Sequence, residues 1–289
     1  MELVDRTLYY SRTRGPLVIY LLGDIHLGTV SCSESLLRQV IGEIKENPYA
    51  YWLDIGDKIE AINISDPRFD INSLPDWILD KKDKNVIPLL QANKYIEYFK
   101  PIAKKCLGLS VGNHEYTVSK KYHNDIHGYI AMNLGVPSLG ASAIIDLALK
   151  DENKKVHDSR KFRIVTEHGY SAARTDGAKI NNIKASALHF ANINLYVSGH
   201  GHTKLIGITT QLDKVGNVKA IVSENKIYSV QVPSFFRSYV QGHASYAEVK
   251  SYPPTSLGVT KCKIVPYKNL STGSKETWHQ NYIMDYWVE

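Results

Sequence analysis

INLYVSGHGH, residues 193–202, joins an apolar run to two histidines that lie two residues apart. The run from Ile193 to Val197 is typical of a buried β-strand, so both histidines follow the carboxyl end of that strand. Open α/β sheets bind their ligands at the carboxyl ends of their strands. Two histidines separated by one loop residue can face the same ion. The stretch therefore indicates an α/β fold with a ligand or metal site at this strand end.

Four upstream segments repeat the arrangement of an apolar run followed by glycine and polar side chains. They are 17–22 followed by GDIH (23–26), 49–55 followed by GD (56–57), 106–111 followed by GNHE (112–115), and 162–166 followed by EHG (167–169). Between the first two runs, Leu37, Val40, Ile41 and Ile44 have helical spacing after Ser33, a good N-cap residue. The chain thus opens with the strand–helix–strand unit of a parallel sheet.

These strand ends carry seven oxygen or nitrogen donors in all. The donors are Asp24, His26, Asp57, Asn113, His168, His200 and His202, and we expect them at one edge of the sheet. Seven donors exceed what one four-coordinate ion needs, whereas two ions that share a bridging carboxylate would use them all. Carboxylate, amide and imidazole ligands together suit manganese, iron or zinc. We expect two divalent ions, manganese first, with iron or zinc as alternatives.

Each piece alone is commonplace, because a lone Asp-x-His or Gly-Asn-His is usually a turn or loop. The joint occurrence, in order and each time directly after an apolar run, is what indicates a site. The six other histidines are expected on the surface or in the core. His123 and His127 follow the third motif closely and are the hardest of the six to dismiss.

The five motifs together resemble the calcineurin-like metallophosphoesterase superfamily, over residues 17–202. The resemblance implies an α/β fold, a four-layer αββα sandwich of two mixed sheets flanked by helices. It implies that Asp24, His26, Asp57 and His202 hold one metal. Asp57, Asn113, His168 and His200 would hold the other, so that Asp57 bridges the two. The position of His114 in this family donates a proton to the leaving oxygen, which is general-acid work suited to imidazole.

The implied reaction is hydrolysis of a phosphoester by a hydroxide that bridges two metal ions. Ser/Thr protein phosphatases carry Asp-Arg-Gly shortly after the second motif, but Lys58-Ile59-Glu60-Ala61 follows here, although GNHE matches that branch. DIHLG (24–28) resembles the opening of the Mre11-type nucleases, in which aspartate usually replaces Glu115. A phosphodiester in nucleic acid or a nucleotide is slightly favoured. A phosphomonoesterase or protein phosphatase is the alternative, and a non-catalytic scaffold of the same fold is the third.

Four cationic side chains are candidates for substrate binding at the mouth of the site. They are Lys58, Lys120, Lys121 and Arg174, all expected in loops next to the proposed metal ligands. The competing interpretation is that they are ordinary solvated charges. The net charge of +6 mildly favours an anionic partner, but there is no dense block of lysine and arginine.

The 289 residues are expected to form one domain, 1–289, with an insertion at about 58–87 and a polar tail from about 269. The insertion is a candidate lid or wall beside the site. Helices are expected at 126–133 and 178–191, paired strands at 143–149 and 162–166, and later strands at 228–232 and 247–249. Three scattered cysteines imply no disulfide framework. We find neither a signal-peptide pattern nor a membrane-length apolar run, and expect a cytoplasmic protein without a membrane partner.

Overall fold

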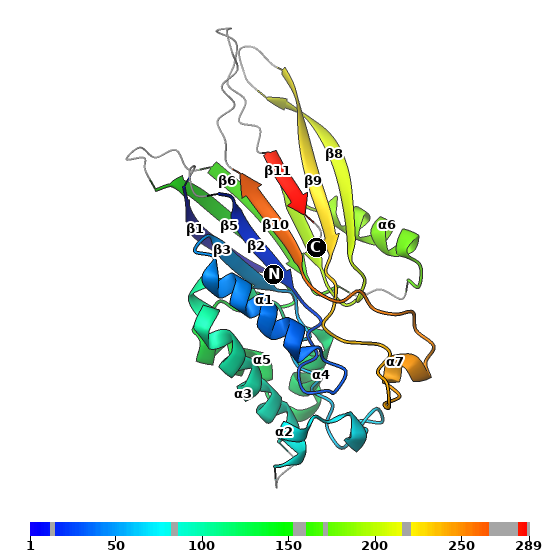
Figure 1. Cartoon of the computed structure of the whole chain (residues 1–289). Coiled ribbons are helices and arrows are strands. Elements are labelled where there is room, and N and C mark those ends of the chain that lie inside the picture. The colour runs from blue at the N-terminus through cyan, green and yellow to red at the C-terminus, as the bar shows by residue number, and fades with distance from the viewer. Residues whose placement is uncertain are drawn as a thin grey trace.

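The structure is a computed structural model, in which two β-sheets pack face to face between outer layers of helix (Figure 1). It describes residues 1–11, 15–81, 86–152, 160–169, 173–215, 221–265 and 283–287. This is the four-layer α/β sandwich that the motifs implied, so the predicted fold class is confirmed.

The first sheet has six strands and is mixed. In spatial order they are β1 (Glu2–Tyr10), β5 (Ser142–Asp151), β6 (Arg160–Glu167), β7 (Leu195–Ser198), β9 (Ile221–Gln231) and β8 (Leu205–Val215). Strands β6, β7 and β9 are parallel, with Glu167 opposite Ser198 and Ser198 opposite Gln231. Their carboxyl ends therefore lie level with one another at one edge of the sheet.

The second sheet has five strands and is also mixed. In spatial order they are β11 (Ile283–Trp287), β10 (Thr260–Val265), β2 (Leu17–Leu22), β3 (Ala50–Asp54) and β4 (Cys106–Leu109). Strands β2, β3 and β4 run parallel, while β10 is antiparallel to both β2 and β11. All six residues of β2 are buried, which explains its uninterrupted apolar sequence.

Helices cover the outer face of each sheet. On the five-stranded sheet lie α1 (Glu34–Glu46), α3 (Ile87–Phe99), the 3-10 helix η2 (Lys100–Lys105) and α5 (Ile126–Leu134), with α4 (Asn113–Tyr122) beside α5. On the six-stranded sheet lies α6 (Asp176–Ala187). The short elements η1 (Ile71–Ser73), α2 (Asp76–Leu79) and α7 (Tyr246–Val249) lie in loops.

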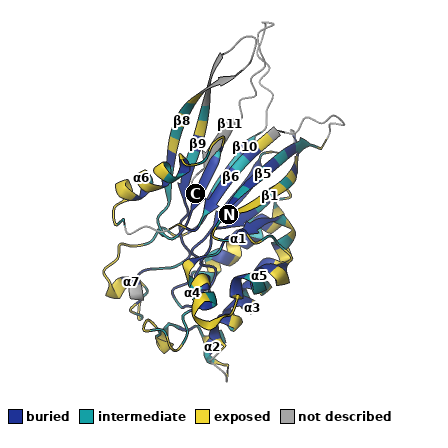
Figure 2. Ribbon diagram, turned by 180° about the vertical axis from the view of Figure 1, so that it is seen from behind, coloured by how far each residue is buried: buried dark blue, intermediate teal, exposed yellow. Residues whose placement is uncertain are grey.

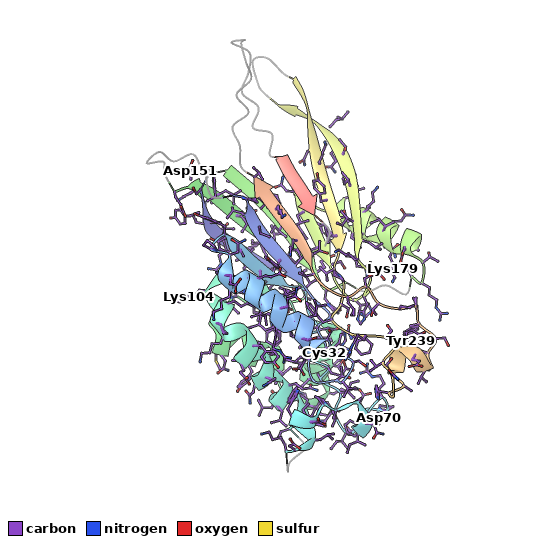
Figure 3. All side chains as sticks on the ribbon, in the orientation of Figure 1. Cys32, Asp70, Lys104, Asp151, Lys179 and Tyr239 are labelled. Atoms are coloured by element: carbon purple, nitrogen blue, oxygen red, sulfur yellow. The ribbon has the colours of Figure 1, made fainter. Side chains whose placement is uncertain are left out.

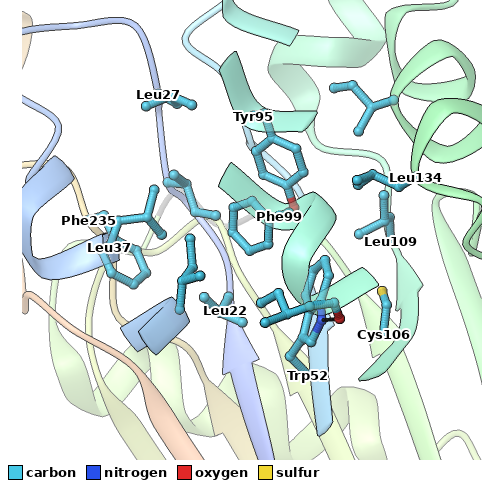
Figure 4. Packing of buried hydrophobic residues seen from close by; sticks show 14 of the residues in the cluster. Leu22, Leu27, Leu37, Trp52, Tyr95, Phe99, Cys106, Leu109, Leu134 and Phe235 are labelled. Carbon is cyan, nitrogen blue, oxygen red and sulfur yellow. Dashed lines mark hydrogen bonds between the residues drawn. The ribbon is translucent and has the colours of Figure 1, made fainter. Parts of the chain in front are cut away.

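The apolar core has three main parts, one for each contact between layers. Side chains of β2, β3 and β4 meet those of β5, β6, β7 and β9 between the sheets. On the other side of the five-stranded sheet, Trp52 packs under Phe99, whose ring stacks on that of Tyr95 at 4.2 Å (Figure 4). Figure 2 shows dark buried residues gathered along the central strands, with exposed residues on β1 and β8 and on the helices.

Most of the predicted elements are present, but the strand predicted at 247–249 is wrong. Those residues lie in the short helix α7. The backbone N–H of Glu248 donates to Ser245 Oγ at 3.2 Å, a local hydrogen bond that favours a helical turn over an extended strand. The predicted helix at 178–191 ends early, at Ala187. The strands predicted at 143–149 and 162–166 do pair, and the helix predicted at 126–133 is present as Ile126–Leu134.

The predicted insertion at 58–87 carries η1 and α2 and has a small core of its own, formed by Leu74, Ile78 and Ile87. A hydrogen bond of 2.9 Å from Trp77 Nε1 to Glu34 Oε1 connects this segment to α1. Its role as a lid or wall stays a prediction, as does the division into one domain. Most of the polar tail predicted from about 269, namely residues 269–282 and 288–289, lies outside the described residues.

Within the described residues, no helix combines the length and apolar character that a membrane crossing requires. Cys32, Cys106 and Cys262 are buried free thiols, as expected for a chain without a disulfide framework.

Candidate metal centre

The seven predicted donors follow strands of both sheets. Asp24 and His26 follow β2, Asp57 follows β3, and Asn113 opens α4 after β4. His168 follows β6, and the two remaining histidines follow β7. The expectation of a single sheet edge is therefore corrected, because two neighbouring sheets contribute. Their loops gather at the lower end of the sandwich, beside α4 (Figure 1).

Five of the donors lie in left-handed backbone conformations that non-glycine residues rarely adopt. Their φ angles are 48° at Asp24, 50° at His26, 53° at Asp57, 65° at His200 and 50° at His202. Such a residue costs of order 1–3 kcal/mol and persists only where its surroundings impose it. Backbone hydrogen bonds of 3.0 Å do so here, from Asp24 N to Gly56 O and from His26 N to Asp57 O. Strained backbone at this density is typical of functional loops.

The ligand atoms of Asp24, His26 and His202 form a first cluster, in which all lie within 4.8 Å of one another. His26 Nε2 lies 3.2 Å from His202 Nε2, and His202 Nε2 lies 3.7 Å from Asp24 Oδ1. His26 Nδ1 contacts the Glu60 carboxylate at 2.8 Å. A carboxylate accepts, so Nδ1 carries the hydrogen, and the Nε2 lone pair faces the cluster when the ring is neutral.

Asp57, His168 and His200 form a second cluster within the same limit. His168 Nε2 lies 3.2 Å from Asp57 Oδ2 and 3.0 Å from Asn113 Oδ1, which is also 2.8 Å from His200 Nδ1. His168 Nδ1 donates to the carbonyl of Ile55 at 2.8 Å, which orients its ring. Asp57 Oδ2 also lies 4.0 Å from His26 Nε2, so one carboxylate reaches both clusters.

His114 lies against the first cluster without belonging to either predicted ligand set. Its ligand atom is within 4.8 Å of those of His26 and Asp57. His114 Nδ1 makes a short hydrogen bond to the Glu60 carbonyl, and its backbone N–H donates to Asp57 Oδ1 at 2.9 Å. Because a carbonyl only accepts, Nδ1 carries a hydrogen. Nε2 is then left either to donate a proton or to offer a lone pair.

Burial and mutual charge set the protonation of the clusters. Burial raises the pKa of Asp24 to about 7, and burial also holds the pKa of His202 well below its usual value. Burial opposes the charged form of Asp57, but His168 and His114 hold its pKa well below the ordinary value. Burial likewise opposes the cation of His168, yet Asp57 and Asp24 raise its pKa to about 10. Carboxylates packed this closely need compensating positive charge.

The side chains present fit a pair of divalent cations. Asp24 Oδ2 is buried and has no hydrogen-bond partner among the described residues. Two imidazole nitrogens, of His26 and His202, point at each other across 3.2 Å, and one carboxylate reaches both clusters. A cation would satisfy the orphaned oxygen and the facing lone pairs together. The assignment of these donors to two separate ions stays a prediction.

Lys58 does not line the mouth of the site, which corrects the prediction made for it. Its side chain is 0% exposed, and its ammonium donates to the carbonyl of Ser110 at 2.6 Å. Asp54 and Glu115 lie at 3.7 and 3.5 Å from the same nitrogen. A side chain held in this way cannot reach a substrate.

Lys120 and Lys121 are exposed, but they lie in the last turn of α4 and not in a loop as predicted. Lys120 lies seven positions after Asn113 in this helix, about 10 Å along its axis at roughly 1.5 Å per residue. Lys121 adds to the effect of Arg68, which holds the pKa of Asp66 at about 2. Arg174 is exposed in the loop before α6, so contact of these three cations with a substrate stays a prediction.

The two histidines that were hardest to dismiss lie outside the clusters. His123 is exposed and ends α4 in a left-handed conformation. His127 is buried in α5, where its Nε2 contacts Ser138 Oγ at 2.9 Å. Both therefore have the surface and core positions that were expected of them.

Several supporting residues were not recognised from the sequence. Glu60 orients two histidines, and Ser234 Oγ donates to the carbonyl of Asp24 at 2.7 Å. Lys179, labelled in Figure 3, lies at the start of α6. Its ammonium donates to Gly201 O at 3.0 Å and so holds the loop between the last two histidines. The Phe236 ring lies 5.3 Å from the His26 ring. Of these supporting residues, only Glu60 could have been suspected from the sequence, because it lies in the loop of the second motif.

No family model and no curated protein sequence matches the chain. Solved structures similar to it include the calcineurin-like phosphoesterase YfkN from Bacillus subtilis, at 14% identity and a TM-score of 0.37, covering 75% of this chain and 91% of that one. The nuclease MPE from Pseudomonas putida is 12% identical at a TM-score of 0.32, covering 90% and 86%. Vps29 from Chaetomium thermophilum is 9% identical at a TM-score of 0.36, covering 93% and 96%.

Calcineurin-like phosphoesterases are thus among the solved structures that this chain is similar to, as the motif resemblance predicted. What the centre can do chemically follows from its own side chains.

Proposed function

We propose that this protein hydrolyses phosphoesters at a centre that binds two divalent metal ions. The observation that supports this most is the position of Asp57, whose Oδ2 lies between the histidines of both clusters. A shared carboxylate lets two like charges lie close together, which is the arrangement used to clamp a phosphoryl group. When bound, the ions supply Lewis acidity and an activated water. The mixed donors favour manganese first, with iron or zinc as alternatives.

The side chains of the protein hold the two ions in position and supply a proton to the leaving group. Asp24, His26 and His202 hold one ion, while Asn113, His168 and His200 hold the other together with Asp57. His114 is placed to protonate the leaving oxygen through Nε2, because its Nδ1 is engaged by the Glu60 carbonyl. The hydrogen bond from His114 N to Asp57 Oδ1 fixes that imidazole relative to the bridging carboxylate.

A phosphodiester, in nucleic acid or a nucleotide, is the first choice of substrate. A phosphomonoester carries a second negative charge, which phosphatases of this kind grip with arginine after the second motif. Here Lys58-Ile59-Glu60-Ala61 follows that motif without an arginine, and its one cation, Lys58, is buried against two carboxylates. A phosphomonoesterase or protein phosphatase is the alternative, and it would need its gripping cation from elsewhere.

The test is a substrate panel with the purified chain and added Mn²⁺, covering nitrophenyl monoester, nitrophenyl diester, nucleotides, DNA and RNA. We expect hydrolysis of diesters to exceed that of monoesters. Brisk monoester hydrolysis without diester cleavage would move the assignment to the phosphatase. Two bound metals with no hydrolysis of any ester would favour the non-catalytic scaffold.

A further inference from the structure

A buried ion cluster joins the loops that carry Asp57 and Asn113. Its members are Asp54, Lys58 and Glu115, each no more than 1% exposed. The ammonium of Lys58 lies 3.7 Å from Asp54 Oδ1 and 3.5 Å from Glu115 Oε2. Burying a charge costs free energy unless the charge is paired and fully hydrogen-bonded. A buried ion cluster at this position therefore suggests a role beyond stability.

The Glu115 carboxylate accepts backbone hydrogen bonds from both loops at once. Its Oε2 accepts from Gly112 N at 2.8 Å and from Asp57 N at 3.2 Å. Its Oε1 accepts from Lys58 N at 2.7 Å and from Ile59 N at 3.3 Å. One side chain thus satisfies four N–H groups on two segments that are 53 or more residues apart in the chain.

The two loops are pressed together at the same point. A Cβ added to Gly112 would lie 2.0 Å from the backbone nitrogen of Asp57, closer than any side chain permits. Gly56, at φ 105°, turns the other loop at the same contact. The two backbones are in direct contact here, with no side chain between them. The relative position of Asp57 and Asn113 is therefore set by the hydrogen bonds that link the two loops.

We propose that Glu115, held in place by Lys58, is a positioning residue that fixes Asp57 and Asn113 at one spacing and so controls the metal affinity of the second cluster. Both loops that Glu115 joins supply ligands to the second cluster, namely Asp57 and Asn113. Of these two residues, only Asp57 also reaches the first cluster. The inference rests on the proposed two-metal function, but it concerns ion binding, which is measured without any substrate.

Glu115→Gln tests this because it keeps the size of the side chain and changes only one oxygen. The new amide NH₂ must face one of the two pairs of backbone N–H groups, and a donor cannot accept from a donor. At least two of the four hydrogen bonds are therefore broken, and the charge opposite Lys58 is removed. Leu147→Ala is the matched control, because it weakens the core between the sheets at a buried site far along β5 from the centre.

The experiment titrates Zn²⁺ into the metal-free full chain labelled with ¹⁵N-histidine and follows the ring nitrogens. His26 and His202 report the first cluster, and His168 and His200 report the second. In Glu115→Gln we expect the second pair to need about 10–100-fold more Zn²⁺ than in the wild type, while the first pair shifts much less. The proposal is overturned if both pairs titrate as in the wild type, or if Leu147→Ala gives the same pattern.

A second measurement needs no variant and applies even if Glu115→Gln fails to fold. In the metal-free wild-type chain, the amides of Asp57, Lys58, Ile59 and Gly112 should be protected from hydrogen exchange, because Glu115 holds them before any ion binds. If these amides exchange as fast as exposed loop amides until Zn²⁺ is added, the ions and not Glu115 order the loops, and the proposal is wrong. Failure of hydrolysis alone would leave this result unchanged.

Discussion

Asp57 is the residue on which both clusters depend, since its Oδ2 lies 3.2 Å from His168 Nε2 and 4.0 Å from His26 Nε2. We expect Asp57→Asn to lose activity and to weaken both metal sites, because the bridging charge offsets repulsion between the two cations. Elemental analysis after dialysis measures this. Asp146→Asn is the control, because that carboxylate pairs with Arg163 and should leave two ions bound. Full activity in Asp57→Asn would contradict the shared-carboxylate arrangement.

His114 offers a prediction that separates metal binding from proton transfer. His114→Asn should keep both ions and lose about 10²–10⁴-fold in kcat, because the leaving oxygen no longer receives a proton. The loss should shrink for a nitrophenyl ester, whose leaving group needs no proton. Steady-state kinetics on good and poor leaving groups checks this. An equal loss on both would point to a positioning role instead.

For single residues, the sequence pointed to the candidate metal ligands but not to the side chains that hold them in place. The seven donors could be found because each stands directly after an apolar run, a purely local pattern. Lys58 was misjudged because its burial depends on Glu115, which lies 57 residues away in the chain. Glu60 and Lys179 were missed for the same reason, since their partners come from other segments.

Among the elements, α5 carries a buried histidine with a defined pH effect. Burial, then the charge of Lys58, lowers the pKa of His127 to about 2 from an ordinary 6.5. Below pH 6.5 the unfolded chain binds a proton that the folded chain refuses, so the stabilising contribution is complete above that pH and falls away as the pH drops. One such proton changes the unfolding free energy by about 1.4 kcal/mol per pH unit.

His127→Gln keeps a polar atom near Ser138 Oγ and removes this titration. Urea unfolding of the metal-free chain at pH 7, 6 and 5 should therefore show a steeper loss of stability in the wild type than in the variant. The comparison cancels the titration of the metal centre, which both chains share. Parallel pH dependence in the two chains would mean that His127 is protonated in the folded state.

Elements with strong periodic patterns were predictable, and those decided by local hydrogen bonds were not. The run of β2 is buried on both faces and reads directly from the sequence. The segment 247–249 alternates like a strand, but a hydrogen bond from the backbone N–H of Glu248 to the Ser245 hydroxyl favours the helical turn of α7 instead. Strand β1 has exposed residues on most of its length, so its apolar pattern is weak.

For the molecule as a whole, the proposed preference for a phosphodiester in nucleic acid can be tested by the salt dependence of binding. If Lys120 and Lys121 contact a nucleic-acid backbone, binding should weaken steeply with salt through counterion release. Replacing both with glutamine should flatten the slope by about 0.9 for each phosphate that is no longer neutralised, while hydrolysis of a small nitrophenyl diester stays unchanged.

The matched control replaces Lys100 and Lys104, an exposed pair on η2; Figure 3 places Lys104 beside α1, far from Lys179 and the loops of the centre. Those substitutions remove the same charge and should leave the slope as it is. Equal flattening in both variants would mean that net charge alone attracts the nucleic acid. In that case the lysines of α4 have no special role.

The central claim is that the two sheets together build one centre for two ions that share Asp57. Anomalous diffraction from crystals of the full chain grown with Mn²⁺ tests it most directly. We predict two anomalous peaks about 3.5–4 Å apart, one beside His26 and His202 and one beside His168 and His200, with the Asp57 carboxylate between them. A single peak, or two peaks that do not share Asp57, would contradict the account.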